Sequence, residues 1–142
     1  FAFDGDAVLF SDEAEKEYQK RGLDDFLSSE KNLANVPLKS GPFRSFVESL
    51  NQLKSEFKGG ANPIRTALVT ARSSPAHERV VKTLRSWGMS VDESLFLGGM
   101  QKADFLKSYG ADIFFDDQAE HCRIASETVL AGHVPSGIKN RS

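Results

Sequence analysis

Two carboxylates near the start of the chain have the types and the spacing that chemistry requires. Asp4 and Asp6 follow the apolar residues 1–3 and are separated only by Gly5. In an extended chain, residues i and i+2 point to the same side, so both carboxylates can converge on one reacting group, and Gly5 allows the backbone to come close. Acidic turns with glycine are also common in surface loops. The apolar run Ala7–Phe10 that follows favours a functional strand end, and the pair suggests phosphate chemistry.

Other polar groups stand at the ends of later apolar runs. The segment Thr70-Ala71-Arg72 follows one run, the pair Asp116-Asp117 follows another, and Lys102 opens the helix expected after a third. In open parallel sheets, ligands bind outside the carboxyl ends of the strands. We therefore expect all four groups to lie on one rim of a sheet, which carries more weight than any single motif.

The elements that must position these groups alternate along the chain. Strands are expected at residues 1–3, 64–69, 94–97, 112–115 and 129–134. Helices are expected from Ser11 to about Gly22 and at 23–35, 42–57, 76–87, 102–109 and 118–128. This alternation predicts a parallel α/β sheet with helices on both faces. The polar tail, residues 135–142, is expected to be loose.

Composition fits a single globular domain. The chain has 142 residues, 39% of them hydrophobic, and a net charge of −2, so it can bury a core and has no basic excess that would indicate nucleic acid. A small molecule is the expected partner.

The lone Cys122 cannot form an internal disulfide and is expected to be a buried small hydrophobe in a reducing cytosol. No run is long enough to span a bilayer. Because the chain lacks an initiator methionine and enters its first strand at once, we expect a fragment that lacks upstream residues.

The four groups on one rim resemble the haloacid dehalogenase superfamily, whose phosphatases carry Asp-x-Asp, a Thr or Ser, a Lys and an acidic pair at these places. More closely, five segments are similar to the cytosolic 5′-nucleotidase type I family and its bacterial relatives: Phe3–Glu13, Leu68–Arg72, Thr83–Gly88, Phe114–Gln118 and Gly132–Gly137. The resemblance implies a Rossmannoid three-layer sandwich with a mostly parallel five-stranded sheet. It also implies one catalytic domain over residues 1–142, with 11–40 as a small helical cap insertion.

The resemblance assigns roles residue by residue. Asp4 would be the nucleophile that forms an aspartyl-phosphate, and Asp6 would protonate the leaving ribose oxygen and later activate water. Lys102 would be the third catalytic residue, paired with the nucleophile and with the phosphoryl oxygens. The phosphate- and substrate-binding residues would be Thr70, Ala71, Arg72 and Gly5.

The resemblance also implies a cofactor and a substrate. Mg²⁺ would be held by Asp4, by the backbone carbonyl of Asp6 and by one of Asp116 and Asp117, with Asp117 preferred as the direct ligand. The substrate would be a nucleoside 5′-monophosphate, hydrolysed in the cytoplasm to nucleoside and phosphate. A homo-oligomer is left open.

Each assignment has a purely structural alternative. Asp116 and Asp117 can cap a helix that starts at Gln118, and Thr70 can simply begin a turn. Lys102 can be one of many solvated lysines, and Arg72 can be an exposed arginine paired with a neighbouring acid. The three histidines have no metal-site spacing and are expected to be structural or peripheral: His77, His121 and His133.

Three other functions remain open at this point. A phosphatase of the same superfamily could act on sugar phosphates or other small esters. A catalytically silent domain would bind Mg²⁺ and a phosphorylated ligand without hydrolysis. A receiver-like regulatory domain also uses clustered acids and a lysine on a parallel sheet, but its phosphoacceptor strand is central in sequence and it lacks the second acid of Asp-x-Asp.

Overall fold

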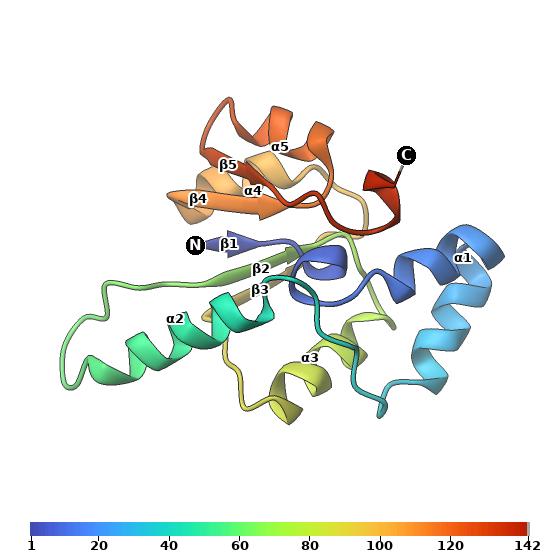
Figure 1. The fold of residues 1–142 in the computed structure, drawn as a ribbon, viewed down its shortest axis with the longest axis horizontal. Coiled ribbons are helices and arrows are strands. Elements are labelled where there is room, and N and C mark those ends of the chain that lie inside the picture. Colours follow the sequence, from blue (N-terminus) through green and yellow to red (C-terminus); the bar gives the residue numbers. More distant parts are fainter. Residues whose placement is uncertain (142) are drawn as a thin grey trace.

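The computed structural model describes residues 1–141 and contains one parallel five-stranded sheet. The strands lie in the order β3-β2-β1-β4-β5, and every neighbouring pair is parallel (Figure 1). Their bounds are β1 Ala2–Phe3, β2 Ala67–Thr70, β3 Glu93–Phe96, β4 Ile113–Asp116 and β5 Leu130–His133. The short β1 is therefore the centre of the sheet, and its end lies between the ends of β2 and β4.

Helices cover both faces of this sheet, so the predicted three-layer sandwich is confirmed. The helices are α2 Arg44–Glu56 and α3 His77–Ser86 on one face, and α4 Lys102–Tyr109 and α5 Ala119–Ala125 on the other (Figure 1). Alternating side chains of the strands enter two separate cores. Phe3 and Leu68 pack in the first core with Val47 of α2, whereas Ala2 and Val69 pack in the second with Leu106 of α4.

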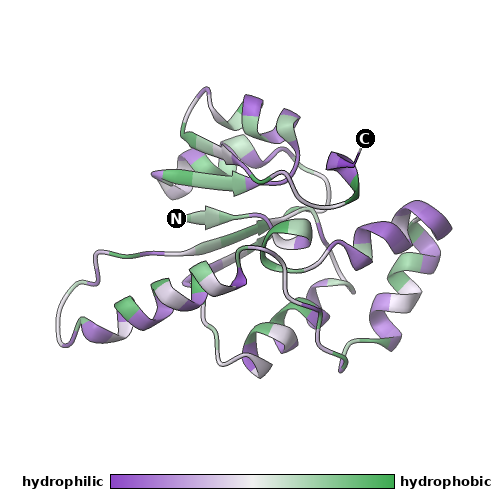
Figure 2. Ribbon diagram, in the orientation of Figure 1, coloured by the Kyte–Doolittle hydropathy of each residue, from purple (hydrophilic) through white to green (hydrophobic). Residues whose placement is uncertain are grey.

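The hydropathy of the chain follows this layering. Figure 2 shows hydrophobic strands in the centre and mixed helices around them. The most polar helix in this view is α1, Glu13–Asn32, which stands beside the carboxyl end of the sheet. None of the helices within residues 1–141 combines the length and the apolar character that crossing a bilayer requires.

Residues 11–39 leave the sheet and return to nearly the same point. Ser11 N–H donates to the carbonyl of Lys39 at 2.8 Å, and Phe10 forms an isolated antiparallel bridge with Ser40. Between these ends, α1 bends at Gly22, where φ is 81°. The bend lies where the sequence predicts that one helix ends and the next begins. A segment whose two ends meet in this way can be accommodated without disturbing the sheet.

The other elements begin or end within a few residues of their expected positions, but the prediction of a loose tail is wrong for residues 135–141. The last residue of the predicted tail, Ser142, lies outside the described residues. The tail forms a short helical turn, Ile138–Asn140, and the Asn140 side chain donates to the carbonyls of Asp117 and Ser136. Gly137 adopts a φ of 77°, and its Cα lies so close to Ala7 that a side chain there would overlap it. These contacts fix the tail against the carboxyl end of the sheet.

We expect Gly41→Ala to destabilise the protein by about 1–3 kcal/mol or more, because overpacking against rigid atoms forces the backbone to shift. A Cβ at Gly41 would overlap the carbonyl oxygens of Val8 and Phe10, and Gly41 N–H donates to Leu9 O at 2.9 Å. Gly60→Ala is the matched control, because its Cβ would enter open space. Urea unfolding of the two variants checks this, and equal midpoints would contradict it.

Candidate functional site

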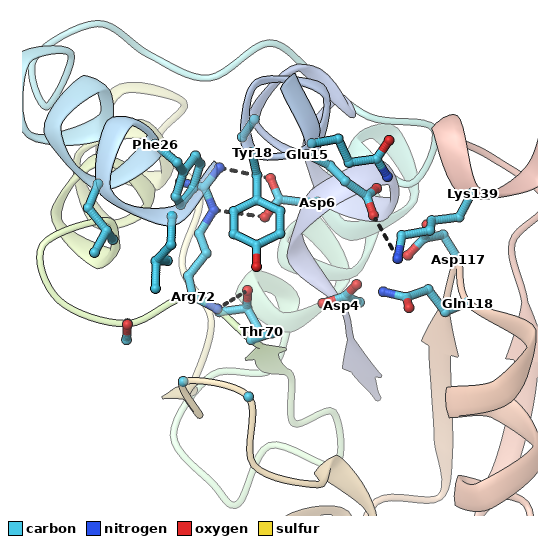
Figure 3. A pocket seen from close by; sticks show the side chains of 18 of the residues that line it. Asp4, Asp6, Glu15, Tyr18, Phe26, Thr70, Arg72, Asp117, Gln118 and Lys139 are labelled. Atoms are coloured by element: carbon cyan, nitrogen blue, oxygen red, sulfur yellow. Dashed lines mark hydrogen bonds and ion pairs between the residues drawn. The ribbon is translucent and has the colours of Figure 1, made fainter. Parts of the chain in front are cut away.

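A pocket of about 430 Å³ lies at the carboxyl ends of the strands. The ends of β1 to β4 contribute to it: Asp4 and Asp6 after β1, Thr70 at the end of β2 with Ala71 and Arg72 after it, Gly98 and Gly99 after β3, and Asp117 after β4. Lys102 contributes from the start of α4. The parallel register places these ends on one rim, as the sequence predicts. Figure 3 shows Asp4, Thr70 and Asp117 on one side of this pocket, facing side chains of α1.

Lys102 lines the pocket and lies between two carboxylates. Its Nζ is 2.8 Å from Asp4 Oδ1 and 2.7 Å from Asp116 Oδ2, and all three side chains are buried. Burial alone lowers the pKa of Lys102, but Asp4 and Asp116 outweigh it, and the pKa lies above its usual value. Lys102 is therefore a fixed, buried cation, which rules out the alternative of a solvated lysine.

The Asp4 carboxylate is desolvated but remains available to a reacting group. Burial raises its pKa to about 6, with Asp116 adding to the rise and Lys102 opposing it. Asp4 N–H donates to Phe115 O at 2.8 Å, which ties the end of β1 to β4. A carboxylate held beside an ammonium group in this way can act as a nucleophile.

Asp116 and Asp117 follow one another but differ in their environments. Asp116 accepts hydrogen bonds from Lys102 and from Gln118 N–H, and His121 Nδ1 lies 3.1 Å from its Oδ2. Burial favours its neutral form, but these donors outweigh burial and lower its pKa. Asp117 Oδ2 is buried and has no hydrogen-bond partner within residues 1–141. Within the same part of the chain, α5 has no side-chain N-cap, so helix capping does not explain the pair.

The residues present fit a divalent cation. One carboxylate oxygen each from Asp4, Asp116 and Asp117 lie within 4.8 Å of one another. Burial, together with Asp4 and Asp116, raises the pKa of Asp117 to about 8. A buried carboxylate with a free oxygen beside two others is costly unless a positive charge compensates it. Hard cations such as Mg²⁺ prefer oxygen ligands of this kind.

A turn over Gly5–Leu9, in which Phe10 N–H donates to Gly5 O at 2.9 Å, positions the second acid. Ala7 adopts a φ of 62°, which is uncommon for a residue with a side chain, and Ala7–Phe10 is buried beneath the turn. A Cβ at Gly5 would lie 3.3 Å from Thr70 Oγ1, so glycine allows this turn to approach β2 closely. The buried apolar run thus anchors the turn from which Asp6 projects.

Arg72 binds Asp6 through two parallel hydrogen bonds. Its Nε lies 2.8 Å from Asp6 Oδ2 and its Nη2 lies 2.8 Å from Asp6 Oδ1 (Figure 3). Arg72 pairs with an acid, as its structural alternative expects, but the exposure in that alternative is wrong because only 5% of the residue is exposed. Arg72 also lines the pocket, so its predicted contact with substrate stays a prediction. Thr70 Oγ1 accepts from Arg72 N–H at 3.2 Å, so the last residue of β2 and Arg72 are held as a unit.

Helix α1 forms the apolar wall of the pocket. Tyr18 and Phe26 contact each other edge to face at 5.8 Å, and Leu23 and Leu27 continue the wall. Figure 3 places Tyr18 and Phe26 opposite Asp4 and Asp117. The pocket is therefore charged at the sheet and apolar at α1.

Sequence reasoning missed several residues around this pocket. His133 Nε2 lies 2.9 Å from the carbonyl of Asp117, and Asn140 Nδ2 donates to the same oxygen at 2.7 Å. Lys139 lines the pocket and lies 3.7 Å from Glu15 of α1. The polar composition of the tail gave no indication of these contacts. The available sequence signal is Gly137, which directly precedes the short helical turn that contains Asn140.

Comparisons with known proteins identify a family and a curated relative but no solved structure. Residues 1–141 match a family model described as 5′-nucleotidase. The chain is 46% identical to cytosolic 5′-nucleotidase 1B of Homo sapiens over 125 residues, which cover 84% of this chain and 20% of the human protein. The chain thus spans about a fifth of the length of this curated relative. No solved structure matches the chain significantly.

Proposed function

Because the chain belongs to the 5′-nucleotidase family of the haloacid dehalogenase superfamily, we propose that it hydrolyses nucleoside 5′-monophosphates to nucleoside and phosphate. The observation that carries this proposal is the buried pair of Asp4 and Lys102, 2.8 Å apart, in a pocket that also holds Asp6, Thr70 and Asp117. The curated relative is named as cytosolic, and we extend the cytoplasmic location to this protein as part of the proposal.

In the proposed first step, Asp4 attacks phosphorus, the bond from phosphorus to the ribose oxygen breaks, and Asp6 gives its proton to that oxygen. Lys102 offsets the negative charge at Asp4 and on the phosphoryl oxygens, and the Thr70 hydroxyl binds the phosphoryl group, with Ala71 and Gly5 close to it.

In the proposed second step, water attacks the phosphorus of the aspartyl-phosphate, and the bond from phosphorus to Asp4 breaks. Asp6 accepts the proton of this water and returns to its starting state. Arg72 binds both oxygens of Asp6 and so orients this carboxylate for the step.

We propose Asp4, Asp117 and the backbone carbonyl of Asp6 as ligands of Mg²⁺, with Asp116 in support. Asp117 is preferred because its Oδ2 accepts no hydrogen bond from residues 1–141, whereas Asp116 is already bound by Lys102 and Gln118. When bound, Mg²⁺ would supply a positive charge that stabilises the phosphoryl oxygens in the transition state.

We propose residues 11–40 as the cap of a single catalytic domain. The two ends of this segment meet at the sheet, and its helix α1 supplies one wall of the pocket. An apolar and aromatic wall opposite a phosphate site suits a nucleoside, because a base can stack on an aromatic ring.

We expect Tyr18→Ala to raise the KM for nucleoside monophosphates by about 5-fold or more, since stacking of a base on an aromatic side chain contributes about 1–3 kcal/mol. Tyr18 lines the pocket and is 47% exposed, so its ring is available to a ligand. Tyr18→Phe keeps the ring and should resemble the wild type. Ribose 5-phosphate, which has no base, is the matched substrate, and an equal rise in its KM would contradict base stacking.

Phosphate release from a panel of esters in the presence of Mg²⁺ tests the proposed function. Faster hydrolysis of nucleoside 5′-monophosphates than of sugar phosphates supports a nucleotidase. The reverse order supports a phosphatase for another small ester. Binding of Mg²⁺ and a phosphate analogue without hydrolysis supports a silent binding domain, and gel filtration of the same sample gives the oligomeric state.

A further inference from the structure

A second buried acid lies behind the pair of Asp6 and Arg72. Glu30, in the last turns of α1, accepts a hydrogen bond from Arg72 Nη1 through Oε2 and one from Arg79 Nη1 through Oε1. Its side chain is 3% exposed, as is that of Arg72. Asp6, Arg72, Glu30 and Arg79 therefore form one chain of alternating charges that runs from the pocket into the interface of α1 with α3.

This arrangement leaves Arg72 no freedom to turn. Nε and Nη2 bind Asp6, Nη1 binds Glu30, and Nη1 also lies 3.4 Å from Ala76 O. The guanidinium group is planar, so an acid that fixes one edge also fixes the orientation of the other. Because Glu30 binds Nη1, it sets the direction of the opposite edge of the guanidinium group, which binds Asp6 through Nε and Nη2.

The polar chain also joins two parts of the molecule that are distant in sequence. Glu30 belongs to α1, which forms the apolar wall of the pocket, whereas Asp6 belongs to the turn after β1. Phe26, one turn before Glu30, lies 5.7 Å from the Arg72 guanidinium carbon. The position of α1 is thereby coupled to the orientation of the Asp6 carboxylate.

We propose that Glu30 is a positioning residue for the hydrolytic reaction, holding Asp6 through Arg72 in the orientation from which it reaches the leaving oxygen. The inference rests on the proposed function. Breaking a buried ion pair leaves the remaining charge uncompensated, so the loss of Glu30 releases Arg72 and lets Asp6 move away.

The leaving group of the substrate separates this role from a merely structural one. The ribose oxygen of a nucleotide leaves as a strongly basic alkoxide unless an acid protonates it, whereas p-nitrophenolate leaves without a proton. The quantity to compare is kcat/KM, because it depends only on the steps up to and including phosphoryl transfer to Asp4. Hydrolysis of the phosphoenzyme comes later and does not affect it. A variant that is only less well folded loses activity on both esters in the same proportion.

We expect Glu30→Gln to lower kcat/KM for a nucleoside monophosphate at least about 10-fold more than kcat/KM for p-nitrophenyl phosphate, since general acid catalysis contributes about 100- to 10,000-fold. Arg72→Lys keeps the positive charge but removes the planar guanidinium group, so it should change the ratio of the two kcat/KM values in the same direction. Combining Glu30→Gln with Arg72→Lys should add little to this change. Glu13→Gln is the matched control, because Glu13 lies on the same helix in an exposed pair with Lys39.

The outcomes distinguish this inference from the function on which it rests. A wild-type protein that hydrolyses neither ester overturns the proposed function and the inference with it. The inference alone is overturned if the wild type hydrolyses both esters and a folded Glu30→Gln variant has nearly the same ratio of the two kcat/KM values. Nearly the same means within about 2-fold of the wild-type ratio. If thermal melting shows that Glu30→Gln is unfolded, the same ratio of kcat/KM values is measured for Arg72→Lys, and an unchanged ratio there overturns the inference.

Discussion

Replacing Asp4 by asparagine is expected to abolish phosphate release, lowering kcat by several orders of magnitude while leaving the fold intact. The amide has the shape of the carboxylate but is not a nucleophile, so the first covalent step has no attacking atom. Lys102 keeps its second partner, Asp116, at 2.7 Å, and the neutral amide introduces no new charge into the buried cluster. Loss of activity therefore reports on the chemistry of Asp4 and not on unfolding.

Two measurements check this expectation. Steady-state release of phosphate gives kcat, and mass spectrometry of protein quenched in acid during turnover detects a phosphoryl group on the wild type but not on Asp4→Asn. Asp104→Asn is the matched control, because Asp104 lies on an exposed position of the same helix as Lys102. Activity that survives Asp4→Asn would refute Asp4 as the nucleophile.

The rim of the site was predictable because each of its groups follows an apolar run. Short buried strands such as Ala67–Thr70 stand out in the sequence, and parallel strands place their carboxyl ends on one edge. Asp4, Thr70 and Asp117 therefore come together by topology alone. Lys102 was predictable for the same reason, since it opens the helix that follows β3.

The residues that hold this rim were not predictable in the same way. Glu30 is one of several acids in a polar helix, and only the packing of α1 on α3 brings it to Arg72, 42 residues later in the chain. Asn140 reaches the carbonyl of Asp117 from a tail whose composition predicts a loose segment. Contacts of this kind depend on the tertiary arrangement, and neither periodicity nor local composition carries them.

The exposure of a charged side chain also depends on its partners. An isolated arginine belongs at the surface, and exposure is one of the two interpretations that the sequence leaves open for Arg72. Two carboxylates, Asp6 and Glu30, allow Arg72 to be buried, and their charges raise its pKa further above its usual value although burial opposes this. The same paired burial converts Lys102 from an ordinary lysine into part of the site.

Replacing Asp117 by asparagine is expected to remove Mg²⁺ binding and, in the metal-free protein above pH 8, to increase the free energy of unfolding by about 1–3 kcal/mol. Burial and the neighbouring Asp4 and Asp116 raise the pKa of Asp117 to about 8, whereas in the unfolded chain it stays near 3.8. Between these values the folded state binds the proton more tightly, so stability falls as pH rises. Asparagine cannot ionise and escapes this penalty.

Mg²⁺ should reverse the order of the two proteins. A ligand that binds only the folded state stabilises it in proportion to the logarithm of its concentration over Kd. Thermal melting with EDTA and with Mg²⁺, from pH 5 to pH 9, should therefore show the wild type less stable than Asp117→Asn without metal and more stable with it. Calorimetric titration with Mg²⁺ gives the affinities directly, with Asp104→Asn again as the control. Unchanged Mg²⁺ affinity in Asp117→Asn would transfer the direct-ligand role to Asp116, whose oxygens would then have to leave Lys102 and Gln118 N–H.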